Sequence, residues 1–357
     1  MSAKRVVIIP GDGIGPEITA AARPVLDAAA RKAGLTLAYT VCDAGGAAID
    51  RHGQPLPEAT LAAAQAADAV LLGAVGGPQW DAVASDIRPE KAILGLRKAL
   101  GLYANLRPVK VTEALAAYSP LKPEIVAGAD ILIVRELTGG IYFGPKREAA
   151  TVDGVEQAAD TEVYSTPEIS RIVRMACQAA KLRRGKVTSV DKANVLATSR
   201  LWRRVAAATA KEFPGVELSH LYVDNCAMQL VLGPAAFDVI VTSNLFGDIL
   251  SDEAAVVAGS IGLLPSASIG DGPGLYEPIH GSAPDIAGQG IANPVGTILS
   301  AAMLLRYSLG AESAAAAIEQ AVDAVLAEGY RTADLYRAGL TKVSTETMGQ
   351  LILKKLQ

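Results

Sequence analysis

The chain has 357 residues, which is enough for two domains of ordinary size with a substantial core. Its net charge of -4 comes from 33 basic and 37 acidic residues; because neither sign forms a long run, the sequence argues against a nucleic-acid or membrane-surface partner. Three scattered cysteines without a C-x-x-C pair indicate a reducing compartment, and no apolar stretch reaches the roughly 20 residues of a membrane span. We therefore expect a cytoplasmic protein that acts on a small molecule.

The first part of the chain alternates short β-branched runs with Ala-rich helical patterns. Strands are expected at residues 5–9, 35–41 and 69–72, and helices at 16–32 and 57–66. Pro24 lies inside the first helical pattern and is expected to kink or split that helix. The alternation predicts a mainly parallel sheet flanked by helices.

The turn "PGDGIGPEI" at residues 10–18 stands where a dinucleotide fingerprint would begin. Its glycines are spaced G-x-G-x-G rather than G-x-G-x-x-G, and Pro16 suits the first turn of a helix. We interpret the stretch as a sharp turn beside a ligand rather than a pyrophosphate cradle. A phosphoryl transferase using it as a phosphate loop is the other hypothesis, but Pro16 and Glu17 stand where that loop needs a lysine.

The second part of the chain continues the alternation with two irregular interruptions. Strands are expected at 131–135, 186–190, 217–223 and 238–242, and helices at 167–182, at 199–211 and from about 295 onward. Residues 138–161 are turn-rich and polar, which predicts an exposed excursion or a functional arm. The Gly/Pro-rich tract at 261–294 is expected to be a long loop with a binding surface.

Three acids indicate a metal site. Asp248 and Asp252 lie four residues apart, so on a helix they share a face and repel each other by a few tenths of a kcal/mol. A cation would remove that conflict, and oxygen ligands favour Mg²⁺ or Mn²⁺ over zinc. The alternative is that the helix dipole places the two acids at an N-terminus, but Asp224, after a separate strand, favours the metal.

Arg97, Arg107 and Arg135 supply three guanidinium groups, two of them near strand ends. Since each charge-assisted bond to a carboxylate contributes about 1.5–3 kcal/mol, together they indicate a multiply charged acid as substrate. Each one taken singly also fits a surface ion pair. Lys192 follows a buried strand and is a candidate base, and Tyr142 lies between glycines and is a candidate proton donor. A solvated lysine and a packing tyrosine are the alternatives, and a non-catalytic carboxylate-binding protein would need neither group.

The motifs "GDGIGPE", "LRKALGLYANLRP", "VRELTGGIYFG", "SVDKANVL", "YVDNCAMQL", "FGDILSDE" and "HGSAPDIAGQGIANP", in this order, resemble the isocitrate/isopropylmalate (β-decarboxylating) dehydrogenase family over nearly the whole chain. The resemblance implies an α/β fold that is not Rossmann, with two domains sharing a large mixed sheet flanked by helices. Residues 1–102 and 258–357 would form the cofactor-binding domain. Residues 103–257 would form the dimerisation and metal/catalytic domain, with an arm at about 138–162.

The reaction that the resemblance implies is oxidative decarboxylation of (2R,3S)-3-isopropylmalate to 2-oxoisocaproate with reduction of NAD, in leucine biosynthesis. Ile93 and Leu94 lie four and three residues before Arg97, so a helix would give the arginine an apolar neighbour suited to an isopropyl group. The alternative is a related dehydrogenase of D-malate, tartrate or homoisocitrate. Two residues depart from the family pattern, since Ile93 replaces the usual leucine and Cys226 replaces a common alanine.

The resemblance also assigns roles to individual residues. It implies Lys192 and Tyr142 as the catalytic pair. Substrate binding is implied for Glu90, Ile93, Leu94, Arg97, Arg107, Arg135 and Asp224, and binding of Mg²⁺ or Mn²⁺ for Asp224, Asp248 and Asp252. In the family, the lysine and the first metal aspartate reach the site from the other subunit of a homodimer.

NAD binding is implied for a loop and two flanking segments. These residues are Gly76, Gly77, Pro78, Glu277, His280, Gly281, Ser282, Ala283, Pro284, Asp285, Ile286, Ala287, Gly288 and Asn293. Asp285 matches the acid that bonds the adenosine ribose hydroxyls. A carboxylate at that position favours NAD and repels the 2′-phosphate of NADP.

Overall fold

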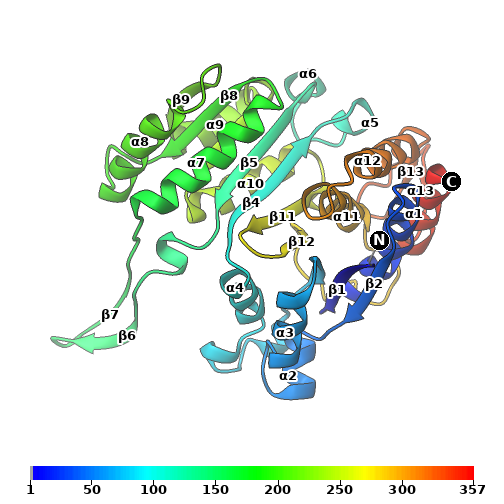
Figure 1. The fold of residues 1–357 in the computed structure, drawn as a ribbon, viewed down its shortest axis with the longest axis horizontal. Coiled ribbons are helices and arrows are strands. Elements are labelled where there is room, and N and C mark those ends of the chain that lie inside the picture. Colours follow the sequence, from blue (N-terminus) through cyan, green and yellow to red (C-terminus); the bar gives the residue numbers. More distant parts are fainter. Residues whose placement is uncertain (1–2) are drawn as a thin grey trace. The chain divides into compact units, whose positions relative to one another are not determined.

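The computed structural model describes residues 3–357, which divide into two compact units. Unit 1 contains the chain up to Leu102 together with Thr112–Tyr118 and Gly259–Gln357, and unit 2 contains Tyr103–Val111 and Ser119–Ala258. In Figure 1 the blue and red ends of the chain therefore belong to the same unit. Across the described residues, no helix is both long and apolar enough to cross a membrane.

Unit 1 contains five strands of the main sheet, in the order β2-β1-β3-β12-β11. Their bounds are β1 Lys4–Gly11, β2 Leu37–Val41, β3 Ala69–Ala74, β11 Pro265–Gly270 and β12 Gly274–Pro278. The pairs within β2-β1-β3-β12 are parallel, and β11 and β12 are antiparallel. All six residues of β3 are buried, as expected for a continuous apolar run in a sheet covered on both faces.

Helices and short 3-10 turns make up much of the rest of unit 1. They are α1 Gly15–Lys32, α2 Gly46–His52, α3 Glu58–Ala66, α4 Glu90–Ala99, α5 Glu113–Ala116, α11 Val295–Tyr307, α12 Glu312–Ala327 and α13 Thr345–Leu356, with 3-10 turns at Pro78–Trp80, Ser85–Ile87 and Ile261–Leu263. A small parallel pair joins β13 Tyr330–Arg331 to β14 Thr341–Lys342. The helix α1 packs against both α11 and α13.

Two expectations for unit 1 need correction. Helix α1 runs through Pro24 without a break, so the predicted split is wrong; Pro24 and Ala20 are both exposed, which leaves the carbonyl that loses its partner open to water. The tract at 261–294 is not one long loop, because β11 and β12 form a hairpin within it. Glycine and proline occupy the hairpin turn and the strand ends, where they are compatible with pairing.

Unit 2 contains another five strands of the main sheet, of mixed direction and in the order β4-β5-β10-β8-β9. Their bounds are β4 Leu102–Lys110, β5 Asp130–Glu136, β8 Lys186–Asp191, β9 Glu217–Tyr222 and β10 Val239–Thr242. Among these five strands, β4 and β5 pair in antiparallel fashion and the other pairs are parallel. The helices are α6 Pro123–Val126, α7 Thr166–Lys181, α8 Ala197–Ala210, α9 Val223–Leu232 and α10 Asn244–Val257, with 3-10 turns at Gly140–Tyr142 and Pro234–Ala236. The predicted α/β class with mixed strands and flanking helices is confirmed.

The irregular segment at 138–161 contains a hairpin that projects from the rest of unit 2 (Figure 1). Strand β6 Lys146–Val152 pairs with β7 Val155–Asp160 across a two-residue turn in which Asp153 and Gly154 have φ values of 52° and 79°. Positive φ at both central residues is typical of the type I′ turn, whose backbone twist matches that of the two strands. Asp-Gly is a common sequence for this turn. Every residue of β7 is exposed, so this segment has no core face within the chain.

Candidate active site

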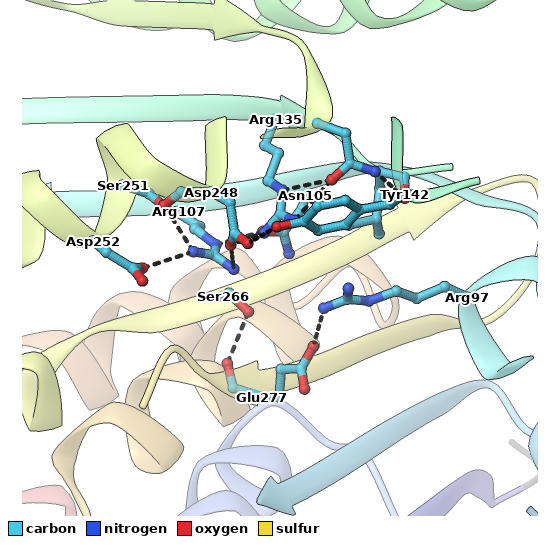
Figure 2. A network of polar contacts seen from close by, with 12 residues as sticks. Arg97, Asn105, Arg107, Arg135, Tyr142, Asp248, Ser251, Asp252, Ser266 and Glu277 are labelled. Atoms are coloured by element: carbon cyan, nitrogen blue, oxygen red, sulfur yellow. Dashed lines mark hydrogen bonds and ion pairs between the residues drawn. The ribbon is translucent and has the colours of Figure 1, made fainter. Parts of the chain in front are cut away.

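The register of β4 against β5 brings two of the predicted arginines to one face. Asn105 lies directly opposite Arg135, and Arg107 is two residues further along the same strand. Because side chains alternate between faces along a strand, all three project to the same side of the sheet. Figure 2 shows the two arginines converging on the carboxylates of α10.

Asp248 is the shared acceptor of this cluster (Figure 2). One of its oxygens, Oδ1, accepts a hydrogen bond from Arg135 and lies 3.5 Å from Nη2 of Arg107, and its Oδ2 accepts from the Tyr142 hydroxyl at 2.8 Å. Asp252 Oδ1 lies 3.2 Å from Nη1 of Arg107. The side chains of Arg107 and Arg135 are only 8% and 2% exposed, so the carboxylates compensate two buried positive charges.

The position and charges of Asp248 and Asp252 bear on the two interpretations of these acids, a metal site or acids placed at a helix N-terminus by the helix dipole. The first turn of α10 carries no acidic residue, so the helix dipole does not account for Asp248 and Asp252. Burial raises the pKa of Asp252, and the Asp248 charge adds to that rise while Arg107 and Arg135 oppose it. Burial, with Asp248 second, also raises the pKa of the Tyr142 phenol, which keeps it protonated at neutral pH.

Lys192 and Asp224 form a separate pair in unit 2. Lys192 follows β8, Asp224 lies in the first turn of α9, and Lys192 Nζ is 2.8 Å from Asp224 Oδ2. The hydrogen bond from Lys192 is the main cause of a lowered pKa for Asp224, which stays ionised. Among the residues that the structure describes, no three acidic, histidine or cysteine side chains are close enough to hold a metal. A single chain therefore does not bring Asp224 together with Asp248 and Asp252.

In unit 1, Arg97 lies on α4 and pairs with Glu277 on β12, with Nη2 2.9 Å from Oε1 (Figure 2). Their side chains are 11% and 9% exposed, so this is a largely buried pair rather than a surface one. Ile93 and Leu94 precede Arg97 by one turn of the same helix, as their spacing predicts, and both side chains are partly exposed. Glu90 at the start of α4 lies beside Gly76, where an added Cβ would be 3.1 Å from its Oε1.

The predicted cofactor loop in unit 1 follows β12 and is held by the "GDGIGP" turn. Ile14 N donates to the Ser282 carbonyl at 2.8 Å, and a Cβ at Gly13 would lie 2.0 Å from the same oxygen. Asp12 accepts from the backbone of Gly76 at 2.8 Å. Because the protein's own backbone occupies the space at Gly13, close chain packing accounts for that glycine, and the expectation of a ligand beside it is not needed.

Two side chains of this loop offer groups to a ligand. Nε2 of His280 is buried and has no hydrogen-bond partner among the described residues, while its Nδ1 lies 2.9 Å from the Gly281 carbonyl. Burial lowers the pKa of His280, so its ring is neutral at pH 7. Asp285 is exposed, and Asn293 is fixed by Asp334 at 3.0 Å. Because Nδ1–H donates to a carbonyl, the neutral ring presents Nε2 as an acceptor, and this acceptor and the Asp285 carboxylate are suited to the free hydroxyl groups of a nucleotide ribose.

Three polar residues of the arginine cluster were missed by the sequence analysis. Asn105 accepts from Arg107 Nε at 2.7 Å, Ser251 accepts from Arg107 Nη1 at 2.6 Å, and Asn244 accepts from Arg135 at 3.1 and 2.7 Å. Asn105 could have been found from the sequence, because it precedes Arg107 by two residues on a strand and so lies on the same face. Asn244 had no such signal, because it lies 109 residues from its arginine.

Comparison with known proteins identifies the family of the chain and several similar proteins. The chain belongs to the isocitrate/isopropylmalate dehydrogenase family, which it matches over residues 5–352. It is 61% identical over 356 residues to the 3-isopropylmalate dehydrogenase of Hahella chejuensis, covering 99% of both chains. It is 59% identical to that of Anaeromyxobacter dehalogenans over the whole of both chains. The solved isocitrate dehydrogenase of Methylococcus capsulatus has a TM-score of 0.87 at 38% identity, with 99% of both chains covered.

Proposed function

We propose that this dehydrogenase oxidises and decarboxylates (2R,3S)-3-isopropylmalate to 2-oxoisocaproate with NAD as hydride acceptor, a step of leucine biosynthesis. The observation that carries the proposal is the cluster in which Arg107, Arg135 and Tyr142 converge on Asp248. Two full-length relatives at 59–61% identity carry the name of this activity. Beside Arg97, Ile93 and Leu94 offer an isopropyl group an apolar surface.

Each residue has a distinct task in this reaction. Lys192 takes the proton of the C2 hydroxyl, and the arginines hold the carboxylates of the substrate. Tyr142, protonated at neutral pH, delivers a proton to C3 after carboxylate loss. NAD, when bound, would supply the acceptor for the hydride that leaves C2.

The donor set fits a hard divalent cation. Asp224, Asp248 and Asp252 would hold Mg²⁺ or Mn²⁺ through oxygen atoms only, and Asp248 and Asp252 lie one turn apart on α10. When bound, the metal would supply a Lewis acid that stabilises negative charge on the reacting substrate. The arginines beside Asp248 and Asp252 then pair with the carboxylates of the substrate.

We further propose a homodimer with shared sites, in which the partner subunit contributes Lys192 and Asp224. The separation of this pair from Asp248 and Asp252 within one chain supports it. Helices α9 and α10 contact each other and expose large apolar side chains, which is unusual for a free surface. These side chains are Met228, Val231, Leu232, Ile249 and Val256. A symmetric pairing of these helices would cover them.

The remaining assignments follow the same division. We propose unit 1 as the cofactor-binding domain and unit 2 as the dimerisation and catalytic domain, with β6 and β7 as an arm toward the partner. The backbone hydrogen bonds that join the loop at 279–294 to Ile14, Leu264 and Thr345 of unit 1, and the exposure of β7, support these roles. A cytoplasmic location is proposed because all three cysteines are free thiols.

A substrate panel tests the reaction. With Mg²⁺ and NAD, kcat/KM for 3-isopropylmalate is expected to exceed that for isocitrate by at least about 100-fold, because Ile93 and Leu94 leave a third carboxylate unpaired. D-malate lacks three carbons and should be about 10–100-fold poorer, at about 0.8 kcal/mol per buried methylene. NADH formation at 340 nm measures the rates. Preference for isocitrate, or no NADH from 3-isopropylmalate, would overturn the proposal.

Reversing the charge at Asp285 tests the assignment of the cofactor. Asp285→Lys is expected to raise KM for NAD about 10–100-fold, through loss of charged hydrogen bonds to the ribose, and to improve turnover with NADP. NADH affinity should fall equally when measured by fluorescence titration without substrate. Asp271→Lys is the matched control, because Asp271 is an exposed acid in the β11–β12 turn and its replacement should change neither value. Unchanged affinity in Asp285→Lys would reject the role of Asp285.

A further inference from the structure

Tyr142 is carried by a 3-10 turn, and a buried carboxylate holds the start of the segment that leads into it. Glu136, the last residue of β5, has a side chain that is 0% exposed. Its Oε1 accepts from Thr138 N at 3.1 Å, and its Oε2 accepts from Gly139 N at 2.8 Å. These bonds fix the backbone immediately before the Gly140–Tyr142 turn.

The ring of Tyr164 fills the space beneath this turn. A Cβ at Gly139 would lie 2.8 Å from Cε1 of Tyr164, and a Cβ at Gly140 would lie 2.5 Å from its hydroxyl oxygen. Gly140 also has φ +72°, which favours glycine. The ring is held in turn by Trp202, edge to face at 5.4 Å between centroids. The two glycines thus allow the turn to sit directly on the tyrosine.

The hydroxyl of Tyr164 connects the carboxylate to the helix that bears the metal-site acids. It donates to Glu136 Oε2 at 3.3 Å and accepts from Asn244 N, at the start of α10, at 2.8 Å. The side chain of Asn244 donates to the carbonyls of Leu137 and Gly139 at 3.0 and 3.2 Å. One hydroxyl therefore ties the Tyr142 turn to α10, which carries Asp248.

We propose that Tyr164 is a positioning residue for proton transfer, acting through Tyr142. With Glu136 and Asn244 it sets the turn against α10, so that the Tyr142 hydroxyl meets Asp248 at 2.8 Å. The hydrogen bonds of Tyr164 and Glu136 described here go to the turn and to the start of α10 rather than to the groups assigned to substrate, so their effect on the reaction passes through these two elements. The inference rests on the function proposed above, in which Tyr142 is the acid.

A double-mutant cycle tests this coupling. Tyr164→Phe keeps the ring and removes the two hydroxyl bonds, and it is expected to lower kcat about 10-fold with KM for substrate within about 2-fold, because a small misplacement of a catalytic group is costly. In a Tyr142→Phe background, the same change should lower kcat by less than about 2-fold, since the group it positions is gone. Glu136→Gln, which keeps the side-chain volume, should behave in the same way and serves if Tyr164→Phe folds poorly.

The control is Tyr276→Phe, which removes one bond at 2.7 Å to Ser308 from a fully buried tyrosine of unit 1. It should lower the melting temperature to a similar extent without changing kcat. If the losses of kcat caused by Tyr164→Phe and Tyr142→Phe multiply in the double variant, the two residues act independently and the inference is wrong. Full activity of Tyr164→Phe would also overturn it. Neither result would affect the proposed function. Full activity of Tyr142→Phe would instead remove the acid that the proposed function assigns, and the inference with it.

Discussion

Replacement of Lys192 by alanine is expected to lower kcat by about three to four orders of magnitude, the upper range for loss of a general base. The fold should persist, because the partner of Lys192 is an exposed carboxylate and such ion pairs contribute little to stability. NADH formation and thermal unfolding of the same preparation measure the two effects. Lys186→Ala, a change to an exposed lysine at the start of the same strand, is the control and should keep full activity.

Mixing inactive variants extends this result to the proposed dimer. If Lys192 serves the partner's site, a heterodimer of Lys192→Ala and Tyr142→Phe subunits has one site with both defects and one with none. Unfolding and refolding the two variants together should therefore restore activity that neither shows alone. Activity that stays at the sum of the separate variants would mean that Lys192 and Tyr142 act within one chain.

Asp248→Asn is expected to have the second largest effect, with kcat lowered at least about 100-fold. The change removes the charge that Arg107, Arg135 and Tyr142 share, and the two arginines are almost completely buried. Stability should fall by about 2–3 kcal/mol, the contribution of a hydrogen bond to a charged group. Urea unfolding measures this loss, and a Mn²⁺ titration followed by electron paramagnetic resonance measures the weakened metal binding.

Asp252→Asn separates the two consequences. Asp252 belongs to the same proposed metal site, but its side chain is 57% exposed and it meets only one of the arginines, at 3.2 Å. Its replacement should weaken Mn²⁺ binding in a similar way while changing stability by no more than about 1 kcal/mol. Equal stability loss in both variants would contradict the central place of Asp248.

Local patterns predicted the parts of the structure that depend on near neighbours. The alternation of apolar runs located most strands and helices, and the spacing of Asp248 and Asp252 correctly predicted that they share a helix. The run through Pro24 and the hairpin in the Gly/Pro-rich tract were mispredicted because both depend on exposure and pairing that composition does not encode.

The partners of the site residues were much less accessible to sequence reasoning. Arg97 meets Glu277 across 180 residues, and Arg135 meets Asn244 across 109. Periodicity relates residues a few positions apart, so contacts of this range arise only from the sheet order. The family resemblance grouped Arg97 and Glu277 within the ligand sites, but the pairing itself was visible only in the structure.

Unit 1 is assembled from the two ends of the chain, and this has a consequence for synthesis. Helix α13 packs on α1, where Gly349 brings the two backbones close; a Cβ there would lie 2.9 Å from the Ala21 carbonyl. During translation, the first hundred residues emerge long before α11, α12 and α13, so their apolar faces wait for partners made last. Unit 2 is nearly continuous and can fold while the ribosome is still working. We therefore expect the nascent N-terminal segment to be the part of this chain that exposes apolar surface longest before its partners are made.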